Sequence, residues 1–168
     1  AADVNTGTPA HILHQSKLDV TTANASLTGM TCTTSGSYAA ADITNLKVRY
    51  STDATLDAGD ATLSTFTNPG VAGSKTFPSF TSQSISSGSS GYIFITADIE
   101  PGATHNNTIS IDALTTSNFT FSSGNKTGST TAGGTQTIKD VTAPTVSTYS
   151  PSDENATVTL NQDLILTF

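Results

Sequence analysis

The sequence predicts an all-β protein, an antiparallel β-sandwich followed by the beginning of a second β domain. Runs in which apolar and polar residues alternate recur along the chain, and no segment shows the 3.6-residue period of an amphipathic helix. Serine and threonine make up about a third of the chain, far above ordinary usage. Threonine favours strands, and serine and glycine favour turns, so the composition indicates short strands joined by many turns. A closed β-barrel is the alternative.

The N-terminal half contains the first predicted strands. Residues 1–9 are rich in turn residues and are predicted to be an incoming linker. One face of the strand that follows carries Ile12, His14, Ser16, Leu18 and Val20. Residues 27–34 form a further strand-like run. Residues 46–50 form another, with Lys47 and Arg49 on the face opposite its apolar residues.

Residues 92–99 are apolar on both faces, which predicts the central strand of a sandwich. Later strands are predicted at 108–114, 119–121 and 135–138, and weaker ones at 62–66 and 75–80. Pro78 places the last of these at an edge or ends it. Eight or nine short strands between frequent turns, in about 130 residues, favour a sandwich of the Ig-like or jelly-roll type.

The C-terminal quarter predicts a domain boundary. We expect a β-sandwich domain over 10–139, an interdomain joint over 140–144 and the N-terminal fragment of an Ig-like domain over 145–168. Pro144 fixes its own φ and restricts Ala143, so the joint is expected to be semi-rigid. A strand at 163–168 has no partner if the domain ends there. We therefore expect the chain to be an excerpt of a longer modular protein.

The charge and the cysteine content limit which partners the protein can bind and in which cellular compartment it is expected. The formal net charge is −7, and the six basic residues are too dispersed to form a patch, which argues against nucleic-acid binding. No stretch is long and apolar enough to span a membrane. The single cysteine, Cys32, rules out an intrachain disulfide and is predicted to be a buried core thiol. These features fit a secreted, extracellular module that relies on β-packing.

The loop at 53–60 is the strongest candidate for ion binding. Asp53, Asp57 and Asp60 together with Gly59 could supply part of the oxygen shell of a calcium ion, although their spacing is not that of an EF-hand. Aspartates that cap a hairpin through Asx turns explain the same pattern without a metal. Asp98 and Glu100 form a second, weaker acidic pair.

The remaining polar residues do not form a catalytic pattern, and no enzymatic activity is expected. His11 and His14 lie three apart, which on a regular strand places them on opposite faces and disfavours a shared zinc ion. No nucleophile elbow, HExxH or P-loop pattern occurs. The chain has no tryptophan, and its tyrosines (Tyr38, Tyr50, Tyr92 and Tyr149) mostly fall in strand patterns, so an aromatic platform for glycans is not expected.

Two segments carry a resemblance to known families. Residues 46–60, with Tyr50-Ser51-Thr52 leading into the acidic hairpin, and residues 85–99 look like a β-sandwich repeat of large secreted proteins of Bacteroidetes. The closing stretches 119–124 and 133–138 also fit, so this resemblance spans most of 10–139. A partial likeness to the CARDB cell-adhesion module covers 50–60 and the strand that ends at Asp98.

The second segment, residues 142–160, is similar to the opening of bacterial Ig-like domains. These families imply stalks, spacers and adhesive arrays. The expected function is therefore a non-catalytic structural or adhesive module whose partners are neighbouring domains of the same polypeptide. The alternatives are a glycan- or protein-binding module assisted by calcium, and an accessory domain of a secreted hydrolase.

Overall fold

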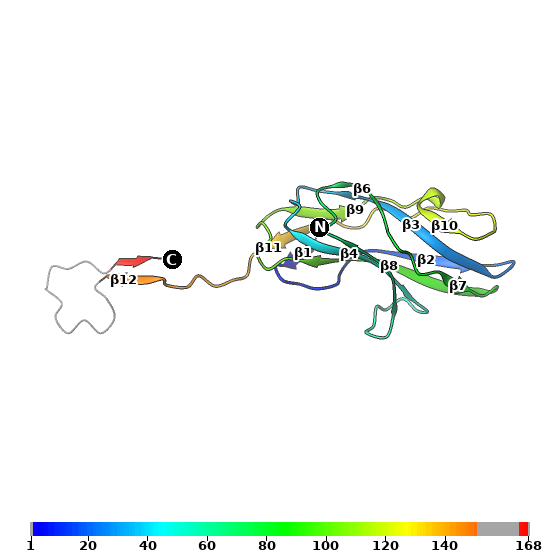
Figure 1. The fold of residues 1–168 in the computed structure, drawn as a ribbon, viewed down its shortest axis with the longest axis horizontal. Coiled ribbons are helices and arrows are strands. Elements are labelled where there is room, and N and C mark those ends of the chain that lie inside the picture. The colour runs from blue at the N-terminus through cyan, green and yellow to red at the C-terminus, as the bar shows by residue number, and fades with distance from the viewer. Residues whose placement is uncertain (1, 151–164, 168) are drawn as a thin grey trace.

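The computed structural model describes residues 2–150 and 165–167, and it is all-β. The described residues contain no α-helix and one short 3-10 turn, η1 (Thr116–Asn118). Two main sheets pack against each other in the elongated body at the right of Figure 1. One shared hydrophobic core fills the space between them, as in a β-sandwich. The Ig-like or jelly-roll type stays a prediction.

The four-stranded sheet has the order β2-β8-β4-β5 and is antiparallel. Its strands are β2 (His11–Val20), β4 (Ile43–Ser51), β5 (Ala61–Thr67) and β8 (Ser89–Ile99). β8 pairs with β2 along one edge and with β4 along the other, and Ile93, Phe94 and Ile95 are all buried. The predicted central strand at 92–99 is therefore confirmed, because both of its faces are covered.

The second sheet is organised around the eleven-residue strand β3. Its strands are β1 (Ala2–Asn5), β3 (Ala25–Ser35), β6 (Gly73–Thr76), β7 (Gln83–Ile85), β9 (Thr108–Ile111), β10 (Phe119–Phe121) and β11 (Gln136–Lys139). β3 pairs with four short strands, β6, β7, β9 and β10, so its length ties together segments far apart in the sequence. The weak candidate at 75–80 corresponds to β6, which ends before Pro78.

The N-terminus differs from the expected linker. Residues Ala2–Asn5 form β1, which pairs in parallel with β11, and Val4 is 3% exposed. The linker prediction is wrong for these residues because Val4 fills a position in the core, whereas the turn-rich Thr6–Pro9 is indeed outside any strand. All other main-sheet pairings of the described residues are antiparallel.

A β-bulge changes the expected face of β2. Ile12 pairs with Thr96 and His14 with the adjacent Ile95, so Leu13 is an extra residue in the ladder. As a result Leu13 is buried and Ile12 is 42% exposed, which contradicts its predicted place beside His14. An alternating pattern cannot reveal this insertion, because both residues are apolar.

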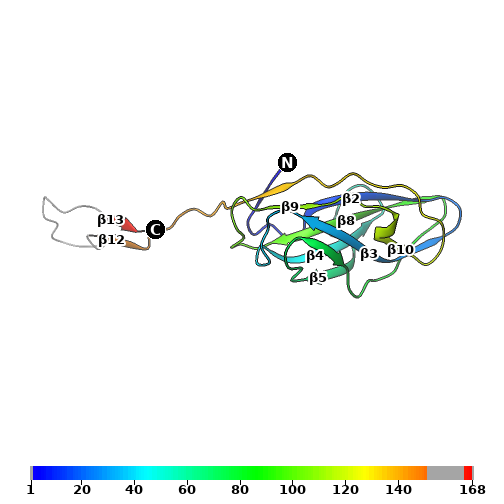
Figure 2. The same ribbon diagram turned by 90° about the horizontal axis from the view of Figure 1, so that it is seen from above.

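The C-terminal segment forms its own small sheet. β12 (Thr148–Ser150) and β13 (Ile165–Thr167) pair antiparallel with each other. The expectation that the strand at 163–168 has no partner is therefore wrong for Ile165–Thr167. The segment after β11 leads away from one end of the sandwich, as both Figure 1 and Figure 2 show. The rest of the predicted Ig-like fragment, 151–164, lies outside the described residues.

Candidate functional site

The acidic loop between β4 and β5 is held by its own hydrogen bonds and by an arginine. The backbone N–H of Thr55 donates to Asp53 Oδ1 at 2.8 Å, and that of Asp57 donates to Asp60 Oδ2 at 2.7 Å. The Arg49 guanidinium donates to the carbonyl oxygens of Asp57 and Asp60 at 2.9 and 3.1 Å. Two of the three carboxylates therefore act as turn caps, the alternative considered for this loop. The calcium site stays a prediction.

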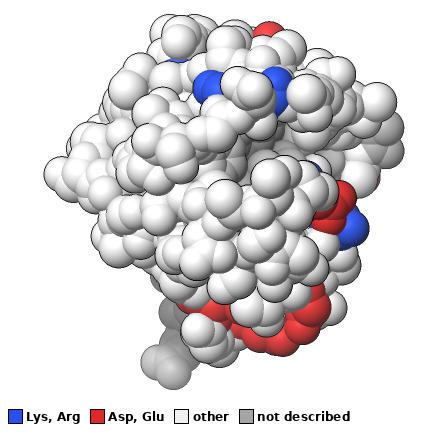
Figure 3. Space-filling model, turned by 90° about the vertical axis from the view of Figure 1, so that its right-hand side faces the viewer, with Lys and Arg blue, Asp and Glu red and all other residues white. Residues whose placement is uncertain are grey.

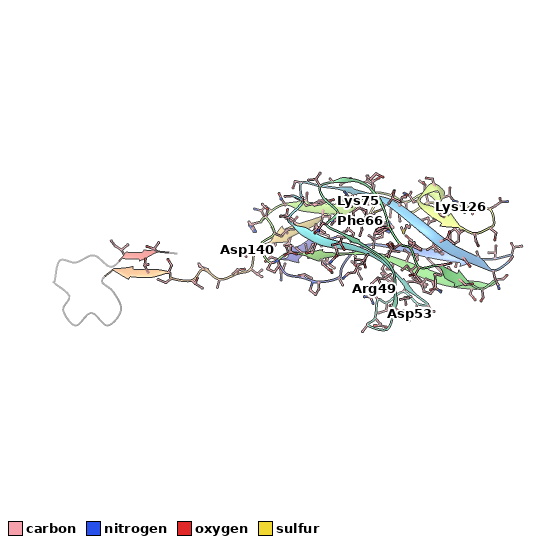
Figure 4. The ribbon with its side chains drawn as sticks, in the orientation of Figure 1. Arg49, Asp53, Phe66, Lys75, Lys126 and Asp140 are labelled. Atoms are coloured by element: carbon pink, nitrogen blue, oxygen red, sulfur yellow. The ribbon has the colours of Figure 1, made fainter. Side chains whose placement is uncertain are left out.

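The same loop covers an aromatic residue on the outer face of the four-stranded sheet. Phe94 is 1% exposed and pairs with Gln15 on one side and Arg49 on the other. Gln15 Nε2 donates to the Ala54 carbonyl at 3.0 Å, and Arg49 donates to the far end of the loop. The loop therefore lies over Phe94, and Figure 4 shows Arg49 and Asp53 together at its base. Burial of a phenylalanine contributes roughly 1.5–3 kcal/mol.

The second acidic pair is also engaged in structure. Lys47 Nζ lies 2.7 Å from Asp98 Oδ2, which also accepts from Asn45 Nδ2, and the Ala10 N–H donates to Oδ1. Burial raises the pKa of Asp98, but these hydrogen bonds and the Lys47 charge outweigh it and leave the pKa below its usual value. Glu100 accepts a hydrogen bond from the Thr44 hydroxyl.

His14 is a buried, neutral hydrogen-bonding residue. Its Nε2 lies 3.0 Å from both Thr130 Oγ1 and the Thr131 carbonyl, and a carbonyl only accepts, so Nε2 carries the proton. Its Nδ1 then accepts from the Ser16 hydroxyl at 3.3 Å. Burial lowers the pKa of His14, and the bond to Thr131 opposes this only in part.

The bulge in β2 overturns the expected separation of the two histidines. His11 Nε2 lies 3.1 Å from Gln136 Oε1 on β11, while His14 contacts Thr130 and Thr131 in the segment that leads to β11. Both imidazoles therefore point toward the other sheet. No third histidine, cysteine, aspartate or glutamate joins them, and no group of three gathers anywhere in the described part of the chain.

The residues Thr130–Gly134, here called the strap, lie directly against β2. A Cβ on Gly133 would sit 2.2 Å from the Leu13 carbonyl oxygen, so this position requires glycine. The Gly133 N–H donates to Ile111 and the Thr130 N–H to Leu114. The strap thus packs against the backbone of Leu13, the residue inserted by the bulge.

Cys32, Tyr38 and Tyr50 belong to the core rather than to a surface site. Cys32 is 1% exposed, and burial raises its pKa to about 12, so the reactive thiolate is disfavoured. The prediction of a buried thiol is confirmed. Tyr38 and Tyr50 are buried and Tyr92 is half-buried. The side chain of Tyr149 lies outside the described residues.

A groove of about 700 Å³ opens between the end of β2 and residues 114–130. Its walls combine apolar side chains, such as Leu18 and Phe121, with many hydroxyl and amide groups and with Lys17, Asp19 and Lys126. Figure 3 views this end of the molecule, where uncharged residues dominate and acidic ones gather at the lower margin. Figure 4 shows Lys126 on the other side of the sandwich from Asp53. Sequence patterns gave no indication of this groove.

Asp42 is the most important polar residue that sequence reasoning missed. It is 1% exposed, and its carboxylate accepts from the N–H groups of Ala39 and Thr104 and from Asn107 Nδ2, at 2.7–2.8 Å. Burial raises the pKa of Asp42, but the hydrogen bonds from Asn107, Thr104 and Ala39 more than offset this and lower it overall. Asp42 immediately precedes β4, and the preference of aspartate for turns is the only local signal at this position.

Comparisons with protein-family models, with curated proteins and with solved structures returned no significant match to the chain. The family resemblances therefore stay predictions. In the part of the chain that the structure describes, no helix has the length and apolar character needed to cross a membrane.

Replacing Asp42 should test its role as a structural acceptor. Asp42→Asn turns one acceptor atom into a donor that faces N–H groups, so we expect a loss of about 2–4 kcal/mol in the free energy of unfolding at pH 7. Because the folded pKa is lowered, the difference from wild type should shrink as pH falls below about 4. Urea denaturation measures both effects. Asp57→Asn, on the exposed loop, is the control and should change stability by less than about 0.5 kcal/mol.

His14 should make stability depend on pH near neutrality. The unfolded imidazole binds a proton below about pH 6.5, whereas the folded one resists it, so the free energy of unfolding should rise with pH between 5 and 7. His14→Gln should flatten that rise, and Thr65→Ala, at an exposed position on β5 that carries no titratable group, should leave it intact. Equal slopes in wild type and His14→Gln, from urea titrations at several pH values, would contradict this assignment.

Proposed function

We propose that this chain is a non-catalytic structural or adhesive module that acts as a spacer or stalk between neighbouring domains of a modular, secreted bacterial surface protein. The observation that carries the proposal is the parallel pairing of β1 with β11. Because the two strands run the same way, a chain that enters through β1 and leaves through β11 keeps one direction. Domains joined before Ala2 and after Asp140 would then follow one another along a single axis.

The start of the joint is fixed by hydrogen bonds, as a spacer requires. The Asp140 N–H donates to His105 Nδ1 at 3.1 Å, and the Thr142 N–H donates to Asp140 Oδ1 at 2.8 Å. Figure 4 places Asp140 at the end of the sandwich from which the chain departs. With Pro144 three residues after Val141, these contacts support a joint of restricted motion.

The histidine, aspartate and cysteine side chains that could take part in catalysis are engaged in structural contacts or buried in the core. His14 bonds the strap, Asp98 bonds Lys47, and Cys32 is a protonated core thiol. These contacts support a non-catalytic role for the sandwich.

A fusion with a compact marker domain at each end of the full chain tests the spacer. We expect the markers on opposite sides of the β1–β11 pair, with one narrow distribution of separations in electron micrographs. A Gly-Ser insertion after Asp140 is the control and should broaden that distribution, because it frees the joint. Markers lying side by side in the uninserted fusion would reject the proposal.

The groove between β2 and residues 114–130 favours a second candidate, a glycan-binding module. Its volume falls in the range of small-ligand sites, and its hydroxyl and amide groups match the hydrogen-bonding needs of a sugar. The acidic loop lies elsewhere, so binding in the groove would not need calcium.

A glycan panel, run in calcium and again in EDTA, tests this candidate. We expect groove binding to survive EDTA and to be lost in Thr127→Trp, which fills the groove, while Thr65→Trp on the exposed face of β5 binds as wild type. Loss in EDTA, and in Asp57→Ala and Asp60→Ala, would instead assign binding to a calcium-loaded loop. If the folded protein binds no glycan on the panel, neither the groove nor the acidic loop is a glycan-binding site.

A further inference from the structure

β1 and β11 form a short parallel pair near the end of the sandwich from which the C-terminal segment departs (Figure 1). The register runs from Ala2 opposite Gln136 to Asn5 opposite Lys139. A hydrogen bond flanks the pair on each side: the Ala2 N–H donates to Thr135 at 3.0 Å, and the Thr6 N–H donates to Lys139 at 2.9 Å. The β1 edge is thus bonded to β11 over its whole length.

Parallel pairing decides how these bonds respond to tension. A pull on the chain before Ala2 and a pull after Lys139 act at opposite ends of the pair, so the two strands slide along each other. All the hydrogen bonds between them are then strained together, since they run across the strands. An antiparallel pair would be opened at one end and lose its bonds one after another.

Both strands are also anchored sideways. Val4 is 3% exposed and Ile138 is fully buried, so each places a side chain in the core. On its other edge β11 pairs with β9, and the Ile138 N–H donates to the Asn107 carbonyl at 2.8 Å. Sliding β1 along β11 therefore requires core side chains to leave their sites as well.

The chain after β1 is fixed to the four-stranded sheet. The Gly7 N–H donates to the Glu100 carbonyl at 3.1 Å, and the Ile99 N–H donates to the Thr8 carbonyl at 2.9 Å. A load that enters at Ala2 and leaves at Lys139 thus crosses the β1–β11 pair before it reaches β2–β10.

We propose that the β1–β11 pair is a mechanical clamp that lets the sandwich bear tension along the chain. The inference rests on the proposed spacer function, because a stalk domain is loaded through its two ends. It adds to that function a specific element, four residue pairs in shear, on which resistance to unfolding under force depends.

Single-molecule stretching of the full chain between marker domains tests the clamp. Ala2 and Thr6 direct their N–H groups to β11, so Val4, midway between them, does the same, and Val4→Pro removes a bond from the pair. At constant force we expect Val4→Pro to unfold at least about tenfold faster than wild type. Val4→Ala keeps the backbone hydrogen bonds, so its unfolding rate under force should lie between those of wild type and Val4→Pro. It serves as the test variant if the proline variant does not fold.

Val48→Ala is the matched control. Val48 is fully buried in β4, away from the load path, so this variant loses stability in urea but should lose less lifetime under force than Val4→Pro. Equal lifetimes of wild type and the Val4 variants, or an equally large loss in Val48→Ala, would overturn the clamp. The marker fusions decide the spacer proposal separately. Markers on opposite sides would support the spacer even if the clamp is wrong, and markers side by side would reject the spacer whatever lifetimes are measured under force.

Discussion

The buried carboxylate of Asp42 is the interaction on which the C-terminal end of the sandwich depends. It joins the turn at Ala39, just before β4, to the turn at Thr104–Asn107, just before β9, and these strands belong to different sheets. The turn at Thr104–Asn107 is also hydrogen-bonded to Ile138 of β11: the Asn106 N–H donates to the Ile138 carbonyl, and the Ile138 N–H donates to the Asn107 carbonyl. One charge with three donors therefore holds the two layers in register where the chain leaves the domain.

Strands with long, regular patterns could be predicted from the sequence, and strands defined by their partners could not. Tyr92–Ile99 is apolar on both faces, which is possible only for a strand covered on both sides, and it lies inside β8. Ala2–Asn5 contains one large apolar residue, and its strand exists because β11 offers an edge to pair with. The pairing, unlike the alternation, depends on residues more than 130 positions away.

The candidate site shows the same division. Aspartates followed by glycine predict turns from local chemistry alone, and the loop at 53–60 does contain Asx-type caps. That this loop covers Phe94 follows from the register of Gln15 and Arg49 around it, which no local pattern contains. The groove has the same origin, since its two walls come from β2 and from residues 114–130.

The burial of the lone thiol has a practical consequence for chemistry on the surface of this protein. Because Cys32 is both inaccessible and protonated at neutral pH, oxidants and maleimides have no thiolate to attack in the folded state. A cysteine introduced at an exposed position would be the sole reactive sulfur, without any need to remove the native one. Dyes, tethers or solid supports can therefore be attached at a chosen point while the core remains intact.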